Sequence, residues 1–536
     1  MFESINKPKT LLLLGNILLV FFLILFSNLK LIPLRPGDFV FFTFLALALA
    51  LYRPGWCFLL FVGMLPLENI DIAPPQLGIA IRPYQFFGAL TILAIVIRLI
   101  SKKLFFKLAK PEWYDWLVVT LMLGGFLSII SAPDKIVSFK LAIIIGTFAA
   151  LYYLVRNYIQ SVEDIKRVIP FFLSSSVIVV LYGIWQNWRF LHNLPHFEVM
   201  AGRPNATFTE PDWLGIFLVL LTSVIYILIY QNSKFQNPND KSSLNSKIQI
   251  LNYVSLILTF ILLVLTVSRS AWLGALVVYI IFVLIFFTDL RWKNWKWRQT
   301  CWLKLKIISS LAITVAIIYV FHLTNFQLFN RVESTGTGLQ KITISCLPYD
   351  KVPYNIHITK LDDRWVCELP NEVSVEELNY CQCRHINLEE IGKERELGNT
   401  IREVYRKDPN VNFRSEIYRK SVAEIKNHPI LGIGWGSIGD ILGKDERGAV
   451  LNSSNIFLET WLGAGIIGFL SLLILLGYVL LISIKNYFRA SNDLQKTIDL
   501  FIIVSWFAVV IPNLFNAGIF LGIFWMWLAA VQLKAE

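Results

Sequence analysis

The sequence predicts an all-α polytopic membrane protein of about 12–14 transmembrane helices, with a large extracytoplasmic loop that holds a small β-rich insertion and further helices. Composition is the first observation behind this prediction. Of the 536 residues, 56% are hydrophobic and 16% are charged, whereas soluble domains carry about 25% charged residues. The second observation is that apolar runs of bilayer-spanning length, about 17–25 residues, recur along most of the chain. They lack the alternation typical of barrel strands.

Fourteen apolar segments are candidate helices. The first follows Lys7 and Lys9 and lacks a small-residue cleavage site, so we expect an uncleaved span rather than a signal peptide. The second and third flank Arg53-Pro54-Gly55 and the last two flank Pro512-Asn513, and both pairs are candidates for half-spans. The centres of the fourteen segments are Val20, Leu47, Leu60, Leu93, Thr120, Ile145, Val177, Leu220, Leu258, Val278, Ile313, Leu470, Val504 and Phe524.

The distribution of basic residues predicts the orientation. With the N-terminus inside and the sides alternating, the short inner loops hold 24 of the 49 Lys and Arg residues and the short outer loops hold 8. The other 17 lie in the long segment between about Thr324 and Leu451. Because short loops set topology and long ones do not, we expect both termini in the cytoplasm and the long segment outside. The expected location is a cytoplasmic (inner) membrane.

The net charge of +12 does not indicate nucleic-acid binding. The long outer segment is close to neutral, with 17 basic and 19 acidic residues, so the excess lies on inner loops. There it faces anionic lipid headgroups. We therefore expect membrane lipids, and no nucleic acid, among the partners.

Four domains follow from these patterns. Residues 1–323 hold about eleven N-terminal spans, and residues 452–536 hold the C-terminal ones. Residues 324–396 form the β-rich insertion, with alternating stretches at 341–345, 354–359 and 364–367 that predict three to five strands. Residues 397–451 are expected to be helical with a Gly-rich turn, because apolar residues recur at helical spacing in a first group (Ile401, Val404, Tyr405) and a second (Ile417, Val422, Ile425).

Four of the six cysteines fall in the long segment: Cys346, Cys367, Cys381 and Cys383. An even set in an oxidising compartment predicts two disulfides. Zinc is the alternative, with Cys381, Cys383 and either His385 or His357 as ligands. Zinc sites usually leave two or more residues between paired cysteines, so the disulfides are favoured and no metal is expected.

Four motifs lie, in order, on the predicted outer face. The first is Gly202–Gly215, which contains Arg203 and Glu210. The second is Thr266–Gly274, with Arg269 in a Ser-Arg helix junction. The third is Arg414 and Tyr418 followed by Asn427–Gly436, and the fourth is Ser454–Gly468. Together they resemble the motifs of the O-antigen ligase and polymerase superfamily of bacterial envelope glycosyltransferases, and the resemblance does not extend to the β-rich insertion.

This resemblance implies an enzyme of polysaccharide or lipopolysaccharide biosynthesis. Such an enzyme takes a glycan from an undecaprenyl-diphosphate carrier and transfers it to a lipid or glycan acceptor at the outer face, without metal, nucleotide or cofactor. Because the leaving diphosphate gains negative charge, an arginine fork is suited to bind it. We predict that Arg269 and Arg414 are catalytic and that Arg203 binds substrate.

The fourth motif departs from the ligase pattern at its first position. Ser454-Asn455, nine residues and Gly465-Ile-Ile-Gly468 keep the ligase spacing, but Ser454 stands where the ligase branch has a histidine base. The sequence therefore leaves open whether the protein is a ligase, a polymerase or another transferase. Glu459 is predicted to serve as the base, with Glu210 as a second candidate, and Ser454 and Asn455 are predicted to contact substrate.

Two other functional classes stay open. A membrane transporter of inorganic carbon or lipid-linked glycans is equally multi-spanning. Ion-coupled transporters keep ionisable residues near the bilayer midplane, whereas Asp115, Asp499 and Glu459 lie toward the ends of their segments. A structural assembly protein is the third class, and it would not need arginines at the outer membrane surface.

Overall fold

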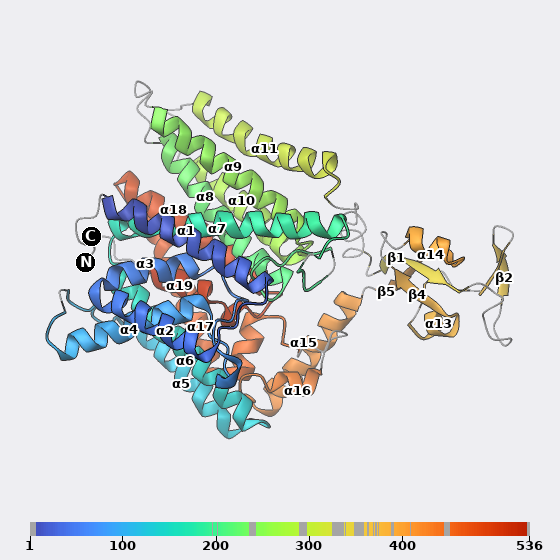
Figure 1. Ribbon diagram of the computed structural model, residues 1–536, viewed down its shortest axis with the longest axis horizontal. Helices are drawn as coiled ribbons and strands as arrows, with labels where there is room; N and C mark the ends of the chain where they lie inside the picture. The colour runs from blue at the N-terminus through green and yellow to red at the C-terminus, as the bar shows by residue number, and fades with distance from the viewer. Residues whose placement is uncertain are drawn as a thin grey trace. The chain divides into compact units, whose positions relative to one another are not determined.

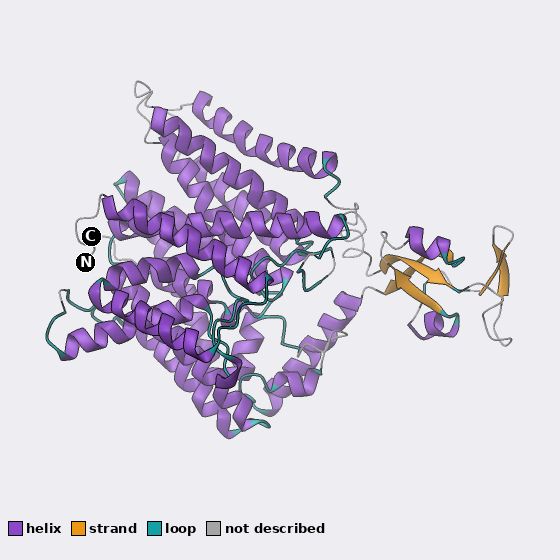
Figure 2. Ribbon diagram, viewed as in Figure 1, coloured by secondary structure: helices purple, strands orange, loops and turns teal. Residues whose placement is uncertain are grey.

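The computed structural model describes residues 7–532 apart from 105, 196, 201, 235–242, 289–296, 324–336, 338, 348–357, 362–363, 368, 370–371, 374, 387–390, 408 and 444–450. The chain divides into two compact units. The first, the helical unit, comprises Met1–Leu323 and Lys420–Glu536, and the second, the β unit, comprises Thr324–Arg419. Figure 2 shows helices throughout the helical unit and the described strands in the β unit.

All fourteen predicted segments coincide with helices of the helical unit, as Figure 1 shows. The N-terminal helices are α1 (Lys7–Asn28), α2 (Pro36–Tyr52), α3 (Pro54–Met64), α4 (Pro83–Ile100), α5 (Trp113–Leu127), α6 (Lys135–Tyr158), α7 (Val162–Leu191), α8 (Pro211–Lys234), α9 (Ser243–Leu265), α10 (Arg269–Thr288) and α11 (Trp297–Val320). The C-terminal ones are α17 (Ile456–Arg489), α18 (Asp493–Asn513) and α19 (Gly522–Ala530). The mainly helical polytopic fold is confirmed.

Nine helices in the described part of the chain are long and apolar enough to cross a membrane, and four shorter apolar helices accompany them. Among the four candidate half-spans, α3, with 11 residues, and α19, with 9, are shorter than a full span. Helix α2 has 17 residues. The half-span prediction is wrong for α18, whose 21 residues are long enough to cross a membrane. At 1.5 Å per residue, α19 covers only about half of a hydrocarbon core of roughly 30 Å.

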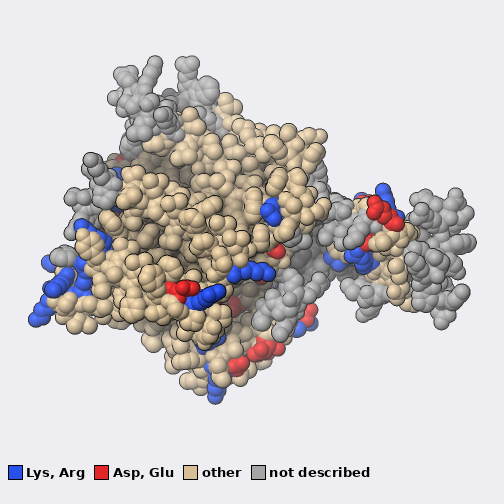
Figure 3. Space-filling model, in the orientation of Figure 1, with Lys and Arg blue, Asp and Glu red and all other residues tan. Residues whose placement is uncertain are grey.

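The exterior of the helical unit is apolar. Leu11 on α1, Phe44 on α2 and Ile136 on α6 are 71%, 68% and 82% exposed. Figure 3 shows one face of the molecule, on which uncharged side chains cover most of the helical unit. An apolar patch of this extent would aggregate in water. It is the expected surface of a protein solvated by lipid chains.

The two ends of the helix bundle can be told apart by their side-chain contacts and connections. At one end, Arg156 of α6 lies 3.3 Å from Asp115 of α5, and Arg98 of α4 donates to the Leu51 carbonyl of α2. At the other end lie the connections before α8, α10 and α17, which carry the first, second and fourth motifs. We call this second end the motif end.

Helix α17 is broken at Gly465, whose φ of 64° and ψ of −170° are not helical. The third motif fills the break. The Ile466 amide donates to the Ile430 carbonyl, and the Leu462 carbonyl accepts from the amides of Ile433 and Gly434. These bonds replace the missing helical bond between residues 462 and 466, so the kink leaves neither group unsatisfied within the membrane.

The β unit contains two sheets. In the first, β1 (Leu339–Cys346) lies between β4 (Cys383–Ile386) and β5 (Thr400–Lys407), and both pairings are antiparallel. In the second, β2 (Ile358–Leu361) pairs with β3 (Arg364–Cys367). Two short helices, α13 (Val375–Tyr380) and α14 (Ile391–Glu396), accompany the strands.

The helical expectation for the stretch after residue 397 is partly wrong. Ile401, Val404 and Tyr405 belong to β5, which pairs with β1 along the full length of both strands. A short apolar run does not distinguish a strand from a helix, and here the pairing with β1 decides. The later group lies in a helix as expected, α15 (Pro409–Asn427), followed by α16 (Ile438–Leu442).

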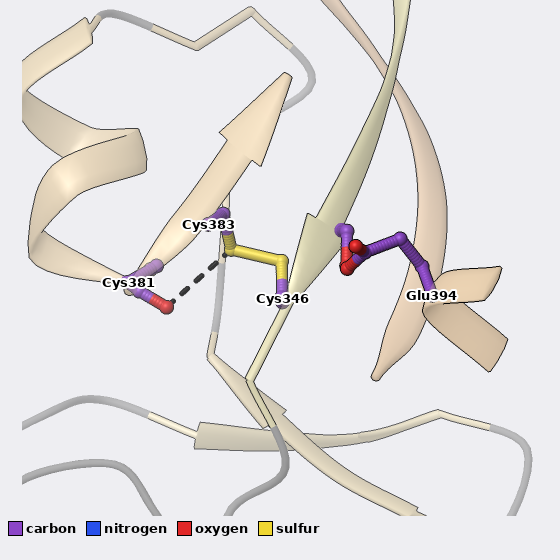
Figure 4. The surroundings of a disulfide bond; sticks show 5 residues. Cys346, Cys381, Cys383 and Glu394 are labelled. Carbon is purple, nitrogen blue, oxygen red and sulfur yellow. Dashed lines mark hydrogen bonds between the residues drawn. A yellow bond between two sulfur atoms is a disulfide. The ribbon is translucent and has the colours of Figure 1, made fainter. Parts of the chain in front are cut away.

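A disulfide joins Cys346 of β1 to Cys383 of β4, which are opposite each other in the sheet (Figure 4). Cys381 is also disulfide-bonded. The side chain of Cys367 lies outside the described residues, so its part in the second of the two predicted disulfides stays a prediction. A disulfide at Cys383 leaves no thiolate there for the zinc alternative.

Candidate functional site at the motif end

The first and second motifs are in direct contact. Arg203 donates through Nε to the Thr266 carbonyl at 2.9 Å, and its Nη2 lies 3.4 Å from Oδ1 of Asp212. Arg203 is only partly buried. The contact therefore holds a guanidinium beside the turn from α9 to α10.

Arg269 is the first residue of α10, directly after that turn, and is half-buried. Two residues earlier, Val267 has a φ of 52°. A left-handed conformation is strained for a β-branched residue, and such strain persists only where its surroundings enforce it. Ala206 of the first motif and Ser454 of the fourth have φ of 47° and 50°. Strained backbone thus occurs in all three motifs that meet here.

Close helix packing at the motif end depends on two glycines. A Cβ on Gly215 of α8 would lie 2.6 Å from the Cβ of Ala271 of α10. A Cβ on Gly274 of α10 would lie 2.6 Å from Cγ of Pro512 of α18. Both distances are shorter than atoms tolerate, so the small residues set how near α8, α10 and α18 approach.

The connection between α18 and α19 joins the second motif to the fourth. Asn516 donates to Oγ of Ser270 at 3.0 Å, and Asn455 donates to the Leu514 carbonyl at 2.9 Å. Arg203, Arg269 and the start of α17 therefore surround one region at the same end of the bundle. Glu210 lies there too, since its carbonyl accepts the Leu214 amide in the first turn of α8.

Asn455 has a structural role. Its Oδ1 accepts the amides of Phe457 and Leu458 at 2.9 and 3.1 Å, which caps the N-terminus of α17. Since its amide nitrogen is bonded to Leu514, both polar atoms of the side chain hold the fold. Its predicted contact with substrate stays a prediction.

Glu459 lies in the first turn of α17, which begins at Ile456, whereas Ser454 precedes the helix. Glu459 is 4% exposed. Its Oε2 accepts the Ser453 amide at 2.9 Å and lies 2.8 Å from Oγ of Ser453. These contacts hold the loop before α17 and give Glu459 a positioning role, whereas its predicted role as base stays a prediction.

Arg414 lies in the β unit, on the part of α15 that precedes the boundary between the units. It is half-buried and one helical turn from Tyr418. Its convergence with Arg269 therefore stays a prediction.

Sequence patterns missed a buried ion pair at the motif end. Arg82 lies 2.9 Å from Glu68, which is 1% exposed and accepts the Gly522 amide at 2.6 Å. Arg82 also donates to the Phe520 carbonyl. The pair ties the loop before α4 to the start of α19. The sequence does mark Arg82, Glu68, Asn513 and Asn516 in one respect: each is a polar residue in a mostly apolar stretch.

A protein-family model matches part of the chain. A model described as O-antigen ligase matches residues 254–473, from within α9 to within α17. The match contains the second, third and fourth motifs and runs through the β unit, whereas the first motif precedes it. A search of curated proteins finds no match. Residues 254–473 of the chain are therefore similar to the O-antigen ligase family.

Proposed function

We propose that this protein transfers a glycan from a lipid-diphosphate carrier of the undecaprenyl type to a lipid or glycan acceptor at the outer face of the cytoplasmic membrane. The family match supports a glycan-transferring role as ligase or polymerase. The observation that carries the proposal is the meeting of the first, second and fourth motifs at one end of the bundle, through the contacts of Arg203, Asn516 and Asn455.

The charges at the motif end suit a diphosphate leaving group. As the bond between the anomeric carbon and the phosphate oxygen breaks, the electron pair and negative charge stay on the diphosphate. Arg203 and Arg269 can each present two N–H groups to its oxygens. Arg269 also starts α10, whose N-terminal amides favour negative charge. Stabilising a charge that grows in the transition state is what accelerates the transfer.

In this proposal Glu459 is a positioning residue and Asn455 caps α17. Arg414 is proposed as a further cation for the diphosphate, contributed by α15. Ser454 and Glu210 are proposed to contact the sugars.

Two observations support an outer-face site. The basic residues favour the inner loops by 24 to 8, which supports the motif end as the outer end. In this topology the long segment that holds the β unit is expected outside as well, and its Cys346–Cys383 disulfide suits an oxidising compartment.

A deletion strain tests the proposal in the cell. We expect loss of the surface polysaccharide and accumulation of the lipid-linked glycan, both reversed by the wild-type gene. Arg269→Ala should fail to restore the polysaccharide at equal protein level. Arg35→Ala removes an exposed arginine from the same side and should restore it. Equal restoration by both variants would contradict the proposal. Accumulation of the glycan on the inner leaflet alone would favour a transporter instead.

A further inference from the structure

A polar cavity of about 300 Å³ lies at the motif end, and its lining includes Glu198, which accepts the amide of Gly202, the residue before Arg203. The end of α1, the loop after α3, the middle of α7 and the chain before α8 form its walls. Its size is at the lower end of the range of small-molecule sites, which is roughly 300–1,000 Å³. Its polar lining comprises Ser27, Asn28, Asn69, Tyr182, Glu198, Asn205 and Thr207.

The walls of the cavity are held by internal hydrogen bonds. Tyr182 donates to Oδ1 of Asn28 at 2.7 Å, and Asn205 accepts the Val199 amide at 3.1 Å. Thr207, also in the lining, donates to the Pro66 carbonyl and accepts the Asn69 amide through its own carbonyl. The side chain of Asn69 is exposed to the cavity. The shape is therefore set before any ligand binds, which lowers the entropic cost of binding.

Strained backbone also occurs in this lining. Phe197 and Ala206 have φ of 59° and 47°. For a bulky residue such as Phe197 this conformation is rare and is typical of functional sites. It directs a large aromatic ring, 42% exposed, to the cavity rim.

Glu198 supplies the carboxyl group of the cavity. The Gly202 amide donates to its Oε2 at 2.9 Å, which fixes the orientation of the group. Burial raises the pKa of Glu198 to about 7, and the Gly202 hydrogen bond offsets part of this rise. A general base is most effective when its pKa lies near the working pH.

The described surroundings of this carboxyl group contain further titratable and charged side chains. Tyr182 is the other titratable side chain among the described residues of the lining. Arg189 lies over the Phe197 ring at 5.7 Å from its centre. Arg203, in the same loop, is bonded to Thr266 and Asp212 instead.

We propose that this cavity binds a sugar of the acceptor and that Glu198 accepts the proton of the attacking hydroxyl. The amides, hydroxyls and carboxyl group offer both donors and acceptors, which a sugar requires, and Phe197 offers an aromatic face. The hydroxyl oxygen forms the new bond to the donor's anomeric carbon, the bond to the phosphate oxygen breaks, and the proton passes to Glu198. This inference rests on the proposed function and names its base and its acceptor subsite.

The test uses the full-length protein in proteoliposomes supplied with lipid-linked glycan and acceptor extracted from the host's membranes. The wild-type rate should rise as the pH passes through about 7, because Glu198 acts as a base only when ionised. Glu198→Gln should lower the rate at pH 8 by at least about a hundredfold and abolish this rise. Glu198→Asp keeps a carboxyl group and should keep a rise at a lower rate. Asn69→Ala should increase the acceptor KM more than it lowers kcat.

Asp38→Asn is the matched control, since it removes an exposed carboxylate at the motif end without touching the cavity. It should behave as wild type. If wild type transfers glycan and Glu198→Gln keeps both the rate and the rise with pH, the inference is overturned while the proposed function stands. If wild type transfers no glycan from these substrates, the proposed function fails first.

Discussion

Three buried or partly buried carboxyl groups of the helical unit differ in what surrounds them. Glu459 accepts two bonds from Ser453, Glu68 is paired with Arg82, and Glu198 lines a cavity. Sequence spacing alone favoured Glu459 as the base, because it lies near the position of the missing histidine. Hydrogen bonding and burial favour Glu198 as the base instead, and neither can be read from residue spacing.

Glu459→Gln separates the two roles of Glu459. Glutamine keeps an oxygen that accepts the Ser453 amide, so a positioning role predicts a loss of transfer of no more than about tenfold, from a weaker hydrogen bond. Ser453→Ala should cause a loss of similar size. Initial rates in proteoliposomes measure both. A loss beyond a hundredfold in Glu459→Gln, with Ser453→Ala near wild type, would instead make Glu459 the base.

Glu394 makes the β unit sensitive to acid. It is 4% exposed and accepts from Ser345 and Arg384 at 2.6 Å and from Asn399 at 2.7 Å. Figure 4 shows it on the other side of β1 from the disulfide. These bonds lower the pKa of Glu394 to about 2. The ionised form therefore stabilises the unit above the unfolded pKa, near 4.3, and this contribution is lost as the pH falls toward 2.

Hydrogen exchange of β1 peptides between pH 2 and 6, corrected for intrinsic rates, should show protection decreasing below about pH 4. In Glu394→Gln the protection should be lower at pH 6 and nearly independent of pH. An equal pH dependence in the two proteins would contradict this role of Glu394.

At the scale of elements, the break in α17 shows why some motif residues are structural. Gly465 and the third motif exchange hydrogen bonds across the kink, with Trp435 fully buried beside them. A Cβ on Gly465 would lie 2.1 Å from the Ile430 carbonyl oxygen, and the residue's φ is positive. The Gly-x-x-Gly spacing of the fourth motif thus serves the fold at this position.

Gly465→Ala should destabilise the protein by about 2 kcal/mol or more, through backbone strain and the displaced turn. Gly477→Ala is the control in the same helix, because a Cβ there meets nothing within 4 Å. It should be neutral or slightly stabilising. The apparent unfolding temperature in detergent, at one scan rate, compares the two. Equal temperatures would show that the turn does not depend on Gly465.

The sequence predicted the elements better than the site. Every apolar segment became a helix, since length and hydropathy determine membrane spans. Strand β5 was missed because its pattern is ambiguous until β1 pairs with it. Glu198 and the pair of Arg82 and Glu68 lie in no motif. Their roles depend on burial and on partners far away in sequence, which a single sequence does not reveal.

At the scale of the whole molecule, side-chain contacts distinguish two ends of the helical unit. The motif end carries the connections before α8, α10 and α17, and the opposite end carries Arg156 and Arg98. The bias of basic residues predicts that the opposite end faces the cytoplasm.

Cysteine labelling tests this orientation. In a background without Cys57 and Cys301, Leu77→Cys, in the exposed loop at the motif end, should react with an impermeant maleimide in intact spheroplasts. Lys103→Cys, at the opposite end, should react only after permeabilisation. The reverse pattern would place the motifs in the cytoplasm and exclude an outer-face transfer.

The central claim is that the motif end is the site of glycan transfer, and purified protein tests it most directly. In proteoliposomes with the lipid-linked glycan and acceptor, Arg269→Ala should lower the transfer rate by about a hundredfold, equivalent to about 3 kcal/mol of transition-state stabilisation. Arg269→Lys should be nearly as slow if the contact is bidentate, whereas Arg35→Ala should match wild type. Transfer at the wild-type rate by Arg269→Ala and by Arg203→Ala would contradict the account.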